Sequence, residues 1–278
     1  MKRTLIAGVI AGAAVAVAGF APAQASEAPA MLSVLHGVPD LTVDVYVNDE
    51  LTLDDFAPGD LAGPLELPAG TYTVAITAAD AADASSPAIG PVDLPLESGM
   101  NYTAVAHLTE AGDPTATLFT NDISQTAAGQ GRLTVRHVAS APAVDVLAGG
   151  SPVITNLTNP NEAKLDLPAG VISASVAAAG TTEPVLGPAD VEVAEGANTI
   201  VYAWGSLDAG NLALAIQTVT GMHSTPDGVP AGSAGMVATN APGSGMGVWI
   251  AAGAAMLMAA TALVIVSIRR RAVARQEE

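Results

Sequence analysis

The chain has 278 residues, with 27 acidic side chains against nine lysines and arginines, no cysteine and only 3% aromatic residues. The absence of cysteine excludes a disulfide-stapled protein and a cysteine-ligated zinc or iron–sulfur protein. A formal charge of −18 argues against a nucleic-acid-binding protein, because such proteins gain affinity from lysines and arginines that neutralise phosphates.

The N-terminal residues have the features of a secretory signal peptide. Lys2 and Arg3 precede an uncharged apolar run, and Ala23-Gln24-Ala25 supplies the small-x-small pattern that signal peptidase cleaves. We therefore expect residues 1–25 to be removed, so that the exported chain begins at Ser26. The alternative is an uncleaved N-terminal anchor, which the glycines within the apolar run argue against.

The next segment, residues 31–124, alternates apolar and polar residues over short runs that are separated by turns rich in Pro and Gly. This period-2 pattern is typical of half-buried strands, and no convincing amphipathic helix interrupts it. The expected strands are residues 32–36, 42–47, 65–67, 71–77, 89–94, 102–108 and 115–120.

Residues 131–219 repeat the first segment. Leu32-Ser-Val-Leu-His36 aligns with Leu133-Thr-Val-Arg-His137, and the Leu-Pro-Ala-Gly turn at 67–70 recurs at 167–170. The offset between the copies drifts only from 101 to 97 residues, and the polar residues 125–130 join them. Strands in the second copy include residues 133–138, 172–177, 199–204 and 213–219. We predict an all-β protein with two tandem antiparallel immunoglobulin-like β-sandwiches.

The C-terminal part predicts a stalk and a membrane anchor. Residues 220–247 are rich in Gly, Pro, Ser, Thr and Ala, as in a flexible linker. Residues 248–268 carry no charge and are long enough to cross a hydrocarbon core about 30 Å thick as one helix. Four arginines lie in residues 269–278, so the positive-inside rule places this tail in the cytoplasm and the sandwiches outside.

The part between Ser26 and Gly247 is more acidic than the whole chain. It holds 25 acids against Arg132, Arg136 and Lys164, a formal charge of −22. Such a surface favours solubility or the uptake of cations and repels anionic polymers. The spacing of its acids does not match an EF-hand calcium loop.

The opening of the second copy resembles a known family. Leu133-Thr-Val-Arg-His137-Val-Ala-Ser-Ala-Pro142-Ala-Val-Asp145-Val, with Leu167-Pro-Ala-Gly170 and Gly187-Pro188 downstream, is similar to an uncharacterised family of bacterial, notably actinobacterial, exported domains of unknown function. The resemblance implies tandem modules on a surface protein and no particular chemistry. Many relatives carry a sortase signal, L-P-x-T-G, whereas this chain reads Val237-Ala-Thr-Asn-Ala-Pro-Gly243 before the apolar segment. We therefore expect membrane anchoring without covalent attachment to the wall.

Two repeated pairs are the candidate site residues. His36 with Asp44 and His137 with Asp145 recur eight residues apart in both copies. If the two strands form a hairpin, each pair could meet as a hydrogen-bonded couple or as half of a metal site. The competing interpretation, which we favour, gives all four residues structural roles. The chain has no nucleophile elbow, phosphate loop or dinucleotide motif, so we expect no catalytic residue, metal or cofactor.

Three functions fit these features. The favoured hypothesis is a non-enzymatic, single-pass membrane protein that displays two acidic sandwiches to an envelope polymer or a surface protein. The second is a structural spacer of the cell envelope that has no specific ligand. The third is a cell-wall hydrolase, for which the sequence offers only isolated acids. The sequence does not predict the oligomeric state.

Overall fold

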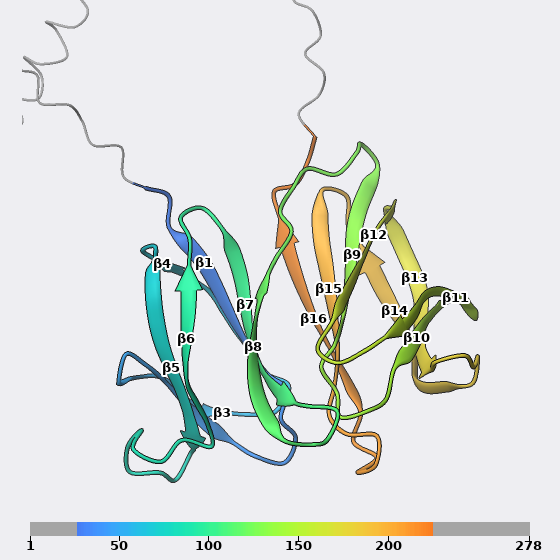
Figure 1. Ribbon diagram of the computed structural model, residues 1–278. Coiled ribbons are helices and arrows are strands. Elements are labelled where there is room, and N and C mark those ends of the chain that lie inside the picture. The colour runs from blue at the N-terminus through green and yellow to red at the C-terminus, as the bar shows by residue number, and fades with distance from the viewer. Residues whose placement is uncertain (1–26, 225–278) are drawn as a thin grey trace, which may run out of the picture. The chain divides into compact units, whose positions relative to one another are not determined.

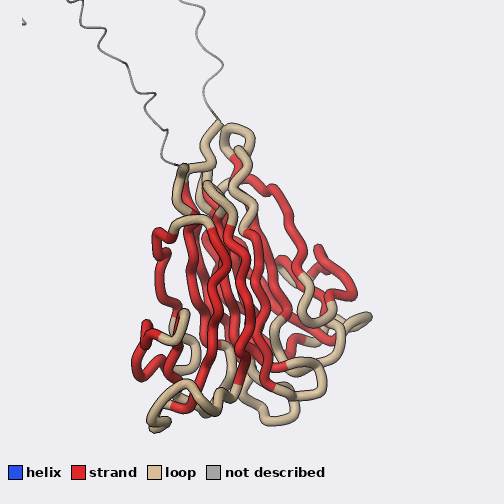
Figure 2. Tube along the Cα trace, turned by 60° about the vertical axis from the view of Figure 1, so that its left-hand side comes forward, coloured by secondary structure: helices blue, strands red, loops and turns tan. Residues whose placement is uncertain are grey.

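The structure, a computed structural model, describes residues 27–224. This part of the chain consists of 16 strands and their connecting loops and contains no helix (Figures 1 and 2). It therefore holds no helix that could cross a membrane. The predicted signal peptide, the membrane segment, the basic tail and nearly all of the predicted stalk lie outside the described residues.

The first copy forms eight strands in two sheets. In one sheet the order is β4-β1-β7-β8, and in the other it is β3-β2-β5-β6 (Figure 1). Neighbouring strands are antiparallel except β1 and β7, which pair in parallel. The strands are β1 (Ala30–His36), β2 (Val43–Val47), β3 (Glu50–Phe56), β4 (Leu61–Leu67), β5 (Gly70–Ala78), β6 (Ile89–Leu96), β7 (Asn101–Leu108) and β8 (Pro114–Thr120).

The second copy repeats this arrangement strand for strand. Its sheets have the orders β12-β9-β15-β16 and β11-β10-β13-β14, and β9 pairs in parallel with β15. The strands are β9 (Gln130–His137), β10 (Val144–Ala148), β11 (Ser151–Leu157), β12 (Glu162–Pro168), β13 (Gly170–Ala178), β14 (Pro184–Val193), β15 (Ala197–Trp204) and β16 (Ala213–Thr220).

The strand order refines the predicted architecture. The prediction of an all-β protein built from sandwiches is confirmed, because each copy places its inward-facing apolar side chains between two four-stranded sheets. The immunoglobulin order, with strands ABED on one sheet and CFG on the other, is not the order found here. The sequence pattern also missed β3, because four of its residues are polar or acidic and its alternation is weak.

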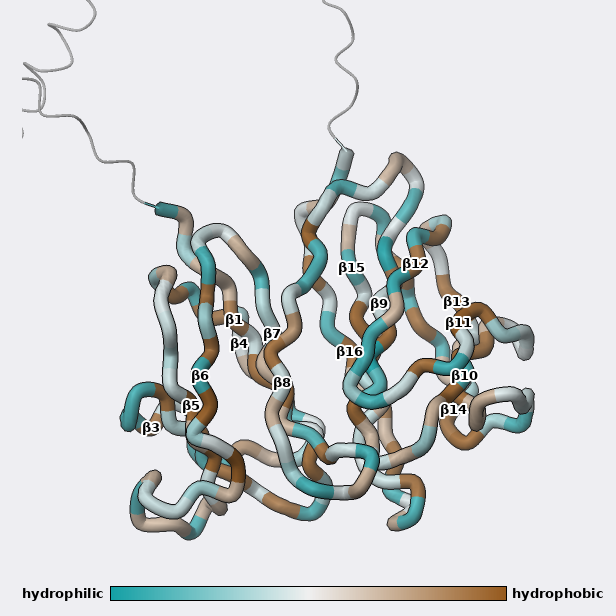
Figure 3. The backbone as a smooth tube through the Cα atoms, in the orientation of Figure 1, coloured by the Kyte–Doolittle hydropathy of each residue, from teal (hydrophilic) through white to brown (hydrophobic). Residues whose placement is uncertain are grey.

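Each sandwich has its own apolar core. Val144, Val146, Val176 and Val191 lie at the centre of the second core, and Val43, Val45 and Ile76 occupy one part of the first. Figure 3 shows the corresponding alternation of hydrophobic and hydrophilic residues along the strands. Burying a valine or leucine side chain stabilises a fold by about 1.5–3 kcal/mol, so these clusters supply much of the free energy of folding.

A third apolar cluster joins the two copies. It combines Leu35, Val105 and Phe119 from the first sandwich with Ile200, Tyr202 and other residues from the second. These side chains lie on the sheet faces that point away from the two cores. All eight residues of β15 are buried as a result, and so are the six central residues of β7. Both faces of these strands are therefore covered, one by the strand's own sandwich and the other by the opposite copy.

Trp204 at the end of β15 is part of this contact. It lies against two glycines of the first copy, Gly37 and Gly59. At Gly59 the backbone has φ +88, and an added Cβ atom would lie 3.1 Å from the Trp204 ring. Glycine is needed at this position both for the positive φ and for the space that the indole occupies.

The C-terminal end of the second copy returns to the linker between the copies. Residues 221–224 follow β16, and Met222 is 1% exposed. The Thr126 amide donates a hydrogen bond to the carbonyl of Met222, and Thr126 forms a β-bridge with His223. These residues were expected to begin the stalk, but they pack against the folded unit instead.

Candidate functional site

The two repeated histidines lie at the ends of β1 and β9 and bond to the loops that follow. His36 Nε2 lies 2.6 Å from the carbonyl oxygen of Leu41, and His137 Nε2 lies 3.0 Å from that of Pro142. Both rings are 1% exposed. Each histidine thus fixes the loop that connects one sheet of its sandwich to the other.

The two repeated aspartates stabilise a β-bulge. Asp44 Oδ1 accepts a hydrogen bond of 3.0 Å from the backbone N–H of Asp55, and Asp145 Oδ1 accepts one of 2.8 Å from that of Asn156. Asp55 and Asn156 have φ angles of 52° and 56°, and the register of β3 and β11 shifts next to them. Asp145 Oδ2 also accepts a hydrogen bond of 2.8 Å from Gly180 N–H.

The histidine and the aspartate of each pair do not bond to each other. β1 and β2 belong to different sheets, as do β9 and β10, so the hairpin that would have brought them together is absent from both copies. Because side chains alternate along a strand, the valines on either side of each aspartate face the core and the aspartate faces away from it. That face is covered all the same, because Asp44 is only 4% exposed and Asp145 only 6%.

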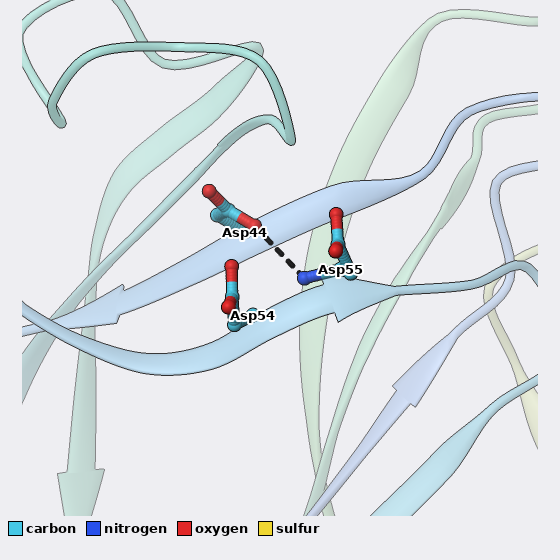
Figure 4. Close-up of side chains that lie close together, drawn as sticks. All are labelled: Asp44, Asp54 and Asp55. Atoms are coloured by element: carbon cyan, nitrogen blue, oxygen red, sulfur yellow. Dashed lines mark hydrogen bonds between the residues drawn. The ribbon is translucent and has the colours of Figure 1, made fainter.

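An acidic cluster surrounds Asp44 in the first copy. Carboxylate oxygens of Asp44, Asp54 and Asp55 lie within 4.8 Å of one another (Figure 4). The second copy has Thr155 and Asn156 in place of Asp54 and Asp55, so the cluster is specific to the first sandwich. Oxygen ligands at this spacing suit a hard divalent cation, but Ca²⁺ takes six to eight oxygens and three carboxylates supply only part of that set. We assign no metal to this cluster.

The largest buried polar group lies between the copies. Arg136 on β9 is 0% exposed, and its guanidinium donates hydrogen bonds to three different side chains. Nε bonds Glu162 at 2.8 Å, Nη1 bonds the Tyr202 hydroxyl at 2.8 Å, and Nη2 bonds Asn121 of the first copy at 2.8 Å. The guanidinium carbon also lies 4.3 Å from the ring centre of Phe119, another residue of the first copy.

The network continues from Tyr202 into the first sandwich. Its hydroxyl donates to Gln217 Oε1 at 2.6 Å, and the same oxygen accepts from Thr103 at 2.9 Å. Gln217 Nε2 donates to the Ser33 hydroxyl at 3.0 Å. Buried polar groups of this kind favour one relative position of the packed elements, because any shift would leave donors and acceptors unpaired.

All the lysines and arginines of the described residues lie on two neighbouring strands. Arg132 and Arg136 are on β9, and Lys164 is on β12. Arg132 pairs with Asp122 and Asp166, Arg136 with Glu162, and Lys164 with Glu162 at 3.0 Å. The first sandwich contains no lysine or arginine. The sequence shows only that this part of the chain has few bases. It does not indicate that they lie together at the contact between the copies.

These features define an all-β protein of two similar sandwiches that share a buried polar interface. Residues 30–147 match the family model described as a domain of unknown function (DUF4397). The match covers the whole first sandwich and continues to Leu147 in β10 of the second. This finding agrees with the resemblance to an uncharacterised domain family, whereas an actinobacterial origin and the repeat motif stay predictions. No curated protein matches the chain.

We expect the free energy of unfolding to decrease as the pH falls from 7 to 5. Burial lowers the pKa of His36, His107 and His137 below the ordinary value of 6.5. The charges of Asp60 and Glu110 act in the opposite direction at His36 and His137, but burial dominates. The unfolded chain therefore takes up protons that the folded chain does not. The contribution of these neutral histidines to the free energy of unfolding is complete above about pH 6.5. Below that pH it decreases by up to ~1.4 kcal/mol per pH unit for each histidine.

Denaturant titrations of the full-length protein at pH 7, 6 and 5 measure this dependence. The variant His107→Gln should reduce the slope by removing one of the three groups. A free energy of unfolding that stays constant or increases toward pH 5 would show that the neutral rings are not coupled to folding.

Proposed function

We propose that the protein is a single-pass membrane protein whose two sandwiches form one rigid, acidic head that binds a basic envelope or extracellular partner without catalysing a reaction on it. The predicted signal peptide and the apolar segment 248–268 support the export and the anchoring. The interface network around Arg136 supports a rigid head, because it fixes the two copies against each other.

One observation carries the choice of partner. Residues 27–224 hold 24 acids and three bases, and the bases all lie in ion pairs on β9 and β12. The rest of the described surface therefore presents carboxylates without neighbouring lysines or arginines. Such a potential attracts cationic partners over distances of about a Debye length, roughly 10 Å at 0.1 M salt, and repels anionic polymers.

The site chemistry supports binding over turnover. His36, His107 and His137 each bond to a backbone carbonyl or a threonine within their own sandwich, and the repeated aspartates bond to backbone amides. Within residues 27–224 no histidine is hydrogen-bonded to a carboxylate or to a serine in the way that general acid–base or nucleophilic catalysis requires.

A spacer without a ligand is the second candidate, and the same acidic surface favours it. A dense negative charge keeps neighbouring anionic polymers apart and holds water at the surface. The two candidates differ in one respect. A binding head captures a basic partner, whereas a spacer captures none.

Capture experiments with the full-length protein in nanodiscs of uncharged lipid separate these functions. The immobilised protein is incubated with an envelope extract at salt concentrations from about 0.05 M to about 0.5 M, and retained molecules are identified by mass spectrometry. We expect selective, salt-sensitive capture of basic molecules, recovered chemically unchanged. Capture of nothing would favour the spacer, and capture of a partner that is cleaved during the incubation would favour the hydrolase.

A further inference from the structure

The first sandwich contains an apolar cavity between its two sheets. Its volume is about 270 Å³, and it extends past side chains such as Leu32, Ile76 and Leu94, which are each at most 4% exposed. The cavity reaches the surface beside Asn48, Glu50 and Thr52, which are exposed residues at and next to the edge strand β3. The site therefore has an apolar interior and a polar rim with one carboxylate.

The second sandwich has the same strand order but distributes its free volume differently. The space deep between its sheets measures about 20 Å³, and a more open hollow of about 340 Å³ lies beside β12 and the start of β13, lined by residues such as Leu165 and Val171. The registers of the central strands align Ala104 with Val201 and Ala116 with Leu214. All four residues line their respective spaces, and the longer Val201 and Leu214 fill volume that the alanines leave open. On the opposite sheet the first copy has the larger side chains, Val74 against Ala174, so the two copies differ in the place of their free volume.

We infer that this cavity is a binding site for a single-chain apolar molecule with an uncharged or cationic polar end. A cavity of ~150 Å³ lined by apolar side chains holds benzene, so 270 Å³ has room for about ten carbon atoms. The apolar lining excludes a polar ligand from the interior, because burying an unpaired polar group costs several kcal/mol. The rim carboxylate of Glu50 disfavours an anionic end at the mouth, as does the surrounding acidic surface.

This site is independent of the proposed binding of a basic partner. The partner would be attracted by surface carboxylates, whereas the cavity accepts an apolar chain from the edge of β3 and β4. Leu65 and Leu67 of β4 line the cavity, so both edge strands contribute to it. Loss of one activity would therefore leave the other in place.

Thermal unfolding of the full-length protein in nanodiscs tests the inference. The probes are 1-decanol, decylamine and decanoate, with shorter and longer 1-alkanols for comparison. We expect decanol and decylamine to raise Tm by about 5–10 °C at a concentration ~100-fold above Kd, with an optimum near ten carbons. Decanoate should give a much smaller shift, and Glu50→Gln should restore part of it.

The variant Ala104→Val/Ala116→Leu fills the cavity with the residues of the second copy. It should lose the ligand-dependent shift, and Ala116→Leu alone serves if the double variant does not unfold cooperatively. Ile216→Ala is the matched control, because Ile216 is 47% exposed on the second sandwich and lines neither the cavity nor the hollow beside β12 and β13. A shift that persists in the filled variants, a shift lost in Ile216→Ala, or no shift with any chain length would overturn the inference.

Discussion

Replacement of Arg136 by alanine is expected to lower the free energy of unfolding by about 3–5 kcal/mol, because the guanidinium is fully buried and its removal takes one hydrogen bond from each of three partners at once. In Arg136→Ala the Tyr202 hydroxyl, Asn121 Oδ1 and the Glu162 carboxylate each lose a hydrogen bond of 2.8 Å. Phe119 also loses the guanidinium that packs on its ring.

The matched control is Arg132→Ala on the same strand. Arg132 is 7% exposed, but its acidic partners Asp122 and Asp166 have side chains that are 32% and 40% exposed. Water can solvate these carboxylates after the substitution, so the expected loss is about 1 kcal/mol. Urea titrations of the full-length variants measure both values. Equal losses for the two substitutions would contradict the assignment of Arg136 as the residue that fixes the interface.

Replacement of Asp145 by alanine is expected to destabilise the protein by about 3–4 kcal/mol, and Asp44→Ala by only about 1–2 kcal/mol. Asp145 accepts hydrogen bonds from two backbone amides, those of Asn156 and Gly180, whereas the structure gives Asp44 one such bond, from Asp55. A hydrogen bond to a charged group contributes about 1.5–3 kcal/mol. Removal of Asp44 also relieves its repulsion with Asp54 and Asp55, which lowers the cost further.

The comparison uses the same residue type at equivalent positions of two copies, so differences in strand propensity cancel. Denaturant titrations that give the larger loss for Asp44→Ala would indicate that the acidic cluster is held together by a bound cation. Equal losses would mean that the Gly180 amide contributes nothing.

The sequence predicted the duplication and most of the strands because both depend on local patterns. The alternation around Val43, Val45 and Ile76 gives strands with one apolar face, and the Leu-Pro-Ala-Gly turns recur in both copies. The order of the strands in the sheets could not be predicted in this way. The parallel pairing of β1 with β7 joins residues about 70 positions apart, and no local signal encodes it.

The contact between the copies could not be predicted from the pattern. Val105, Thr103 and Tyr202 occupy positions that face away from the cores, where the alternation predicts solvent exposure. Their burial depends on how two sandwiches meet, which is a property of the assembled surfaces. Arg136 is the residue from which this contact could have been inferred, because the first copy has Leu35 at the equivalent position. An arginine in place of a leucine needs hydrogen-bond partners, and Asn121 of the first copy is one of them.

The candidate site residues illustrate the same limit. The spacing of His36 and Asp44 recurs in the second copy, but it could not show that the two residues belong to different sheets. The cavity of the first sandwich depends on small residues such as Ala104 and Ala116, whose effect on free volume becomes visible only when both sheets are in place.

The central claim is that the two sandwiches behave as one rigid unit. Hydrogen exchange of the full-length protein, followed by mass spectrometry at increasing denaturant, tests it most directly. The account predicts that amides of β7 in the first copy and β15 in the second open with the same free energy, and that Arg136→Ala lowers both by the same amount. If β7 opens at a lower free energy than β15, or if Arg136→Ala affects β15 alone, the two copies are independent domains and the claim of a single rigid head is wrong.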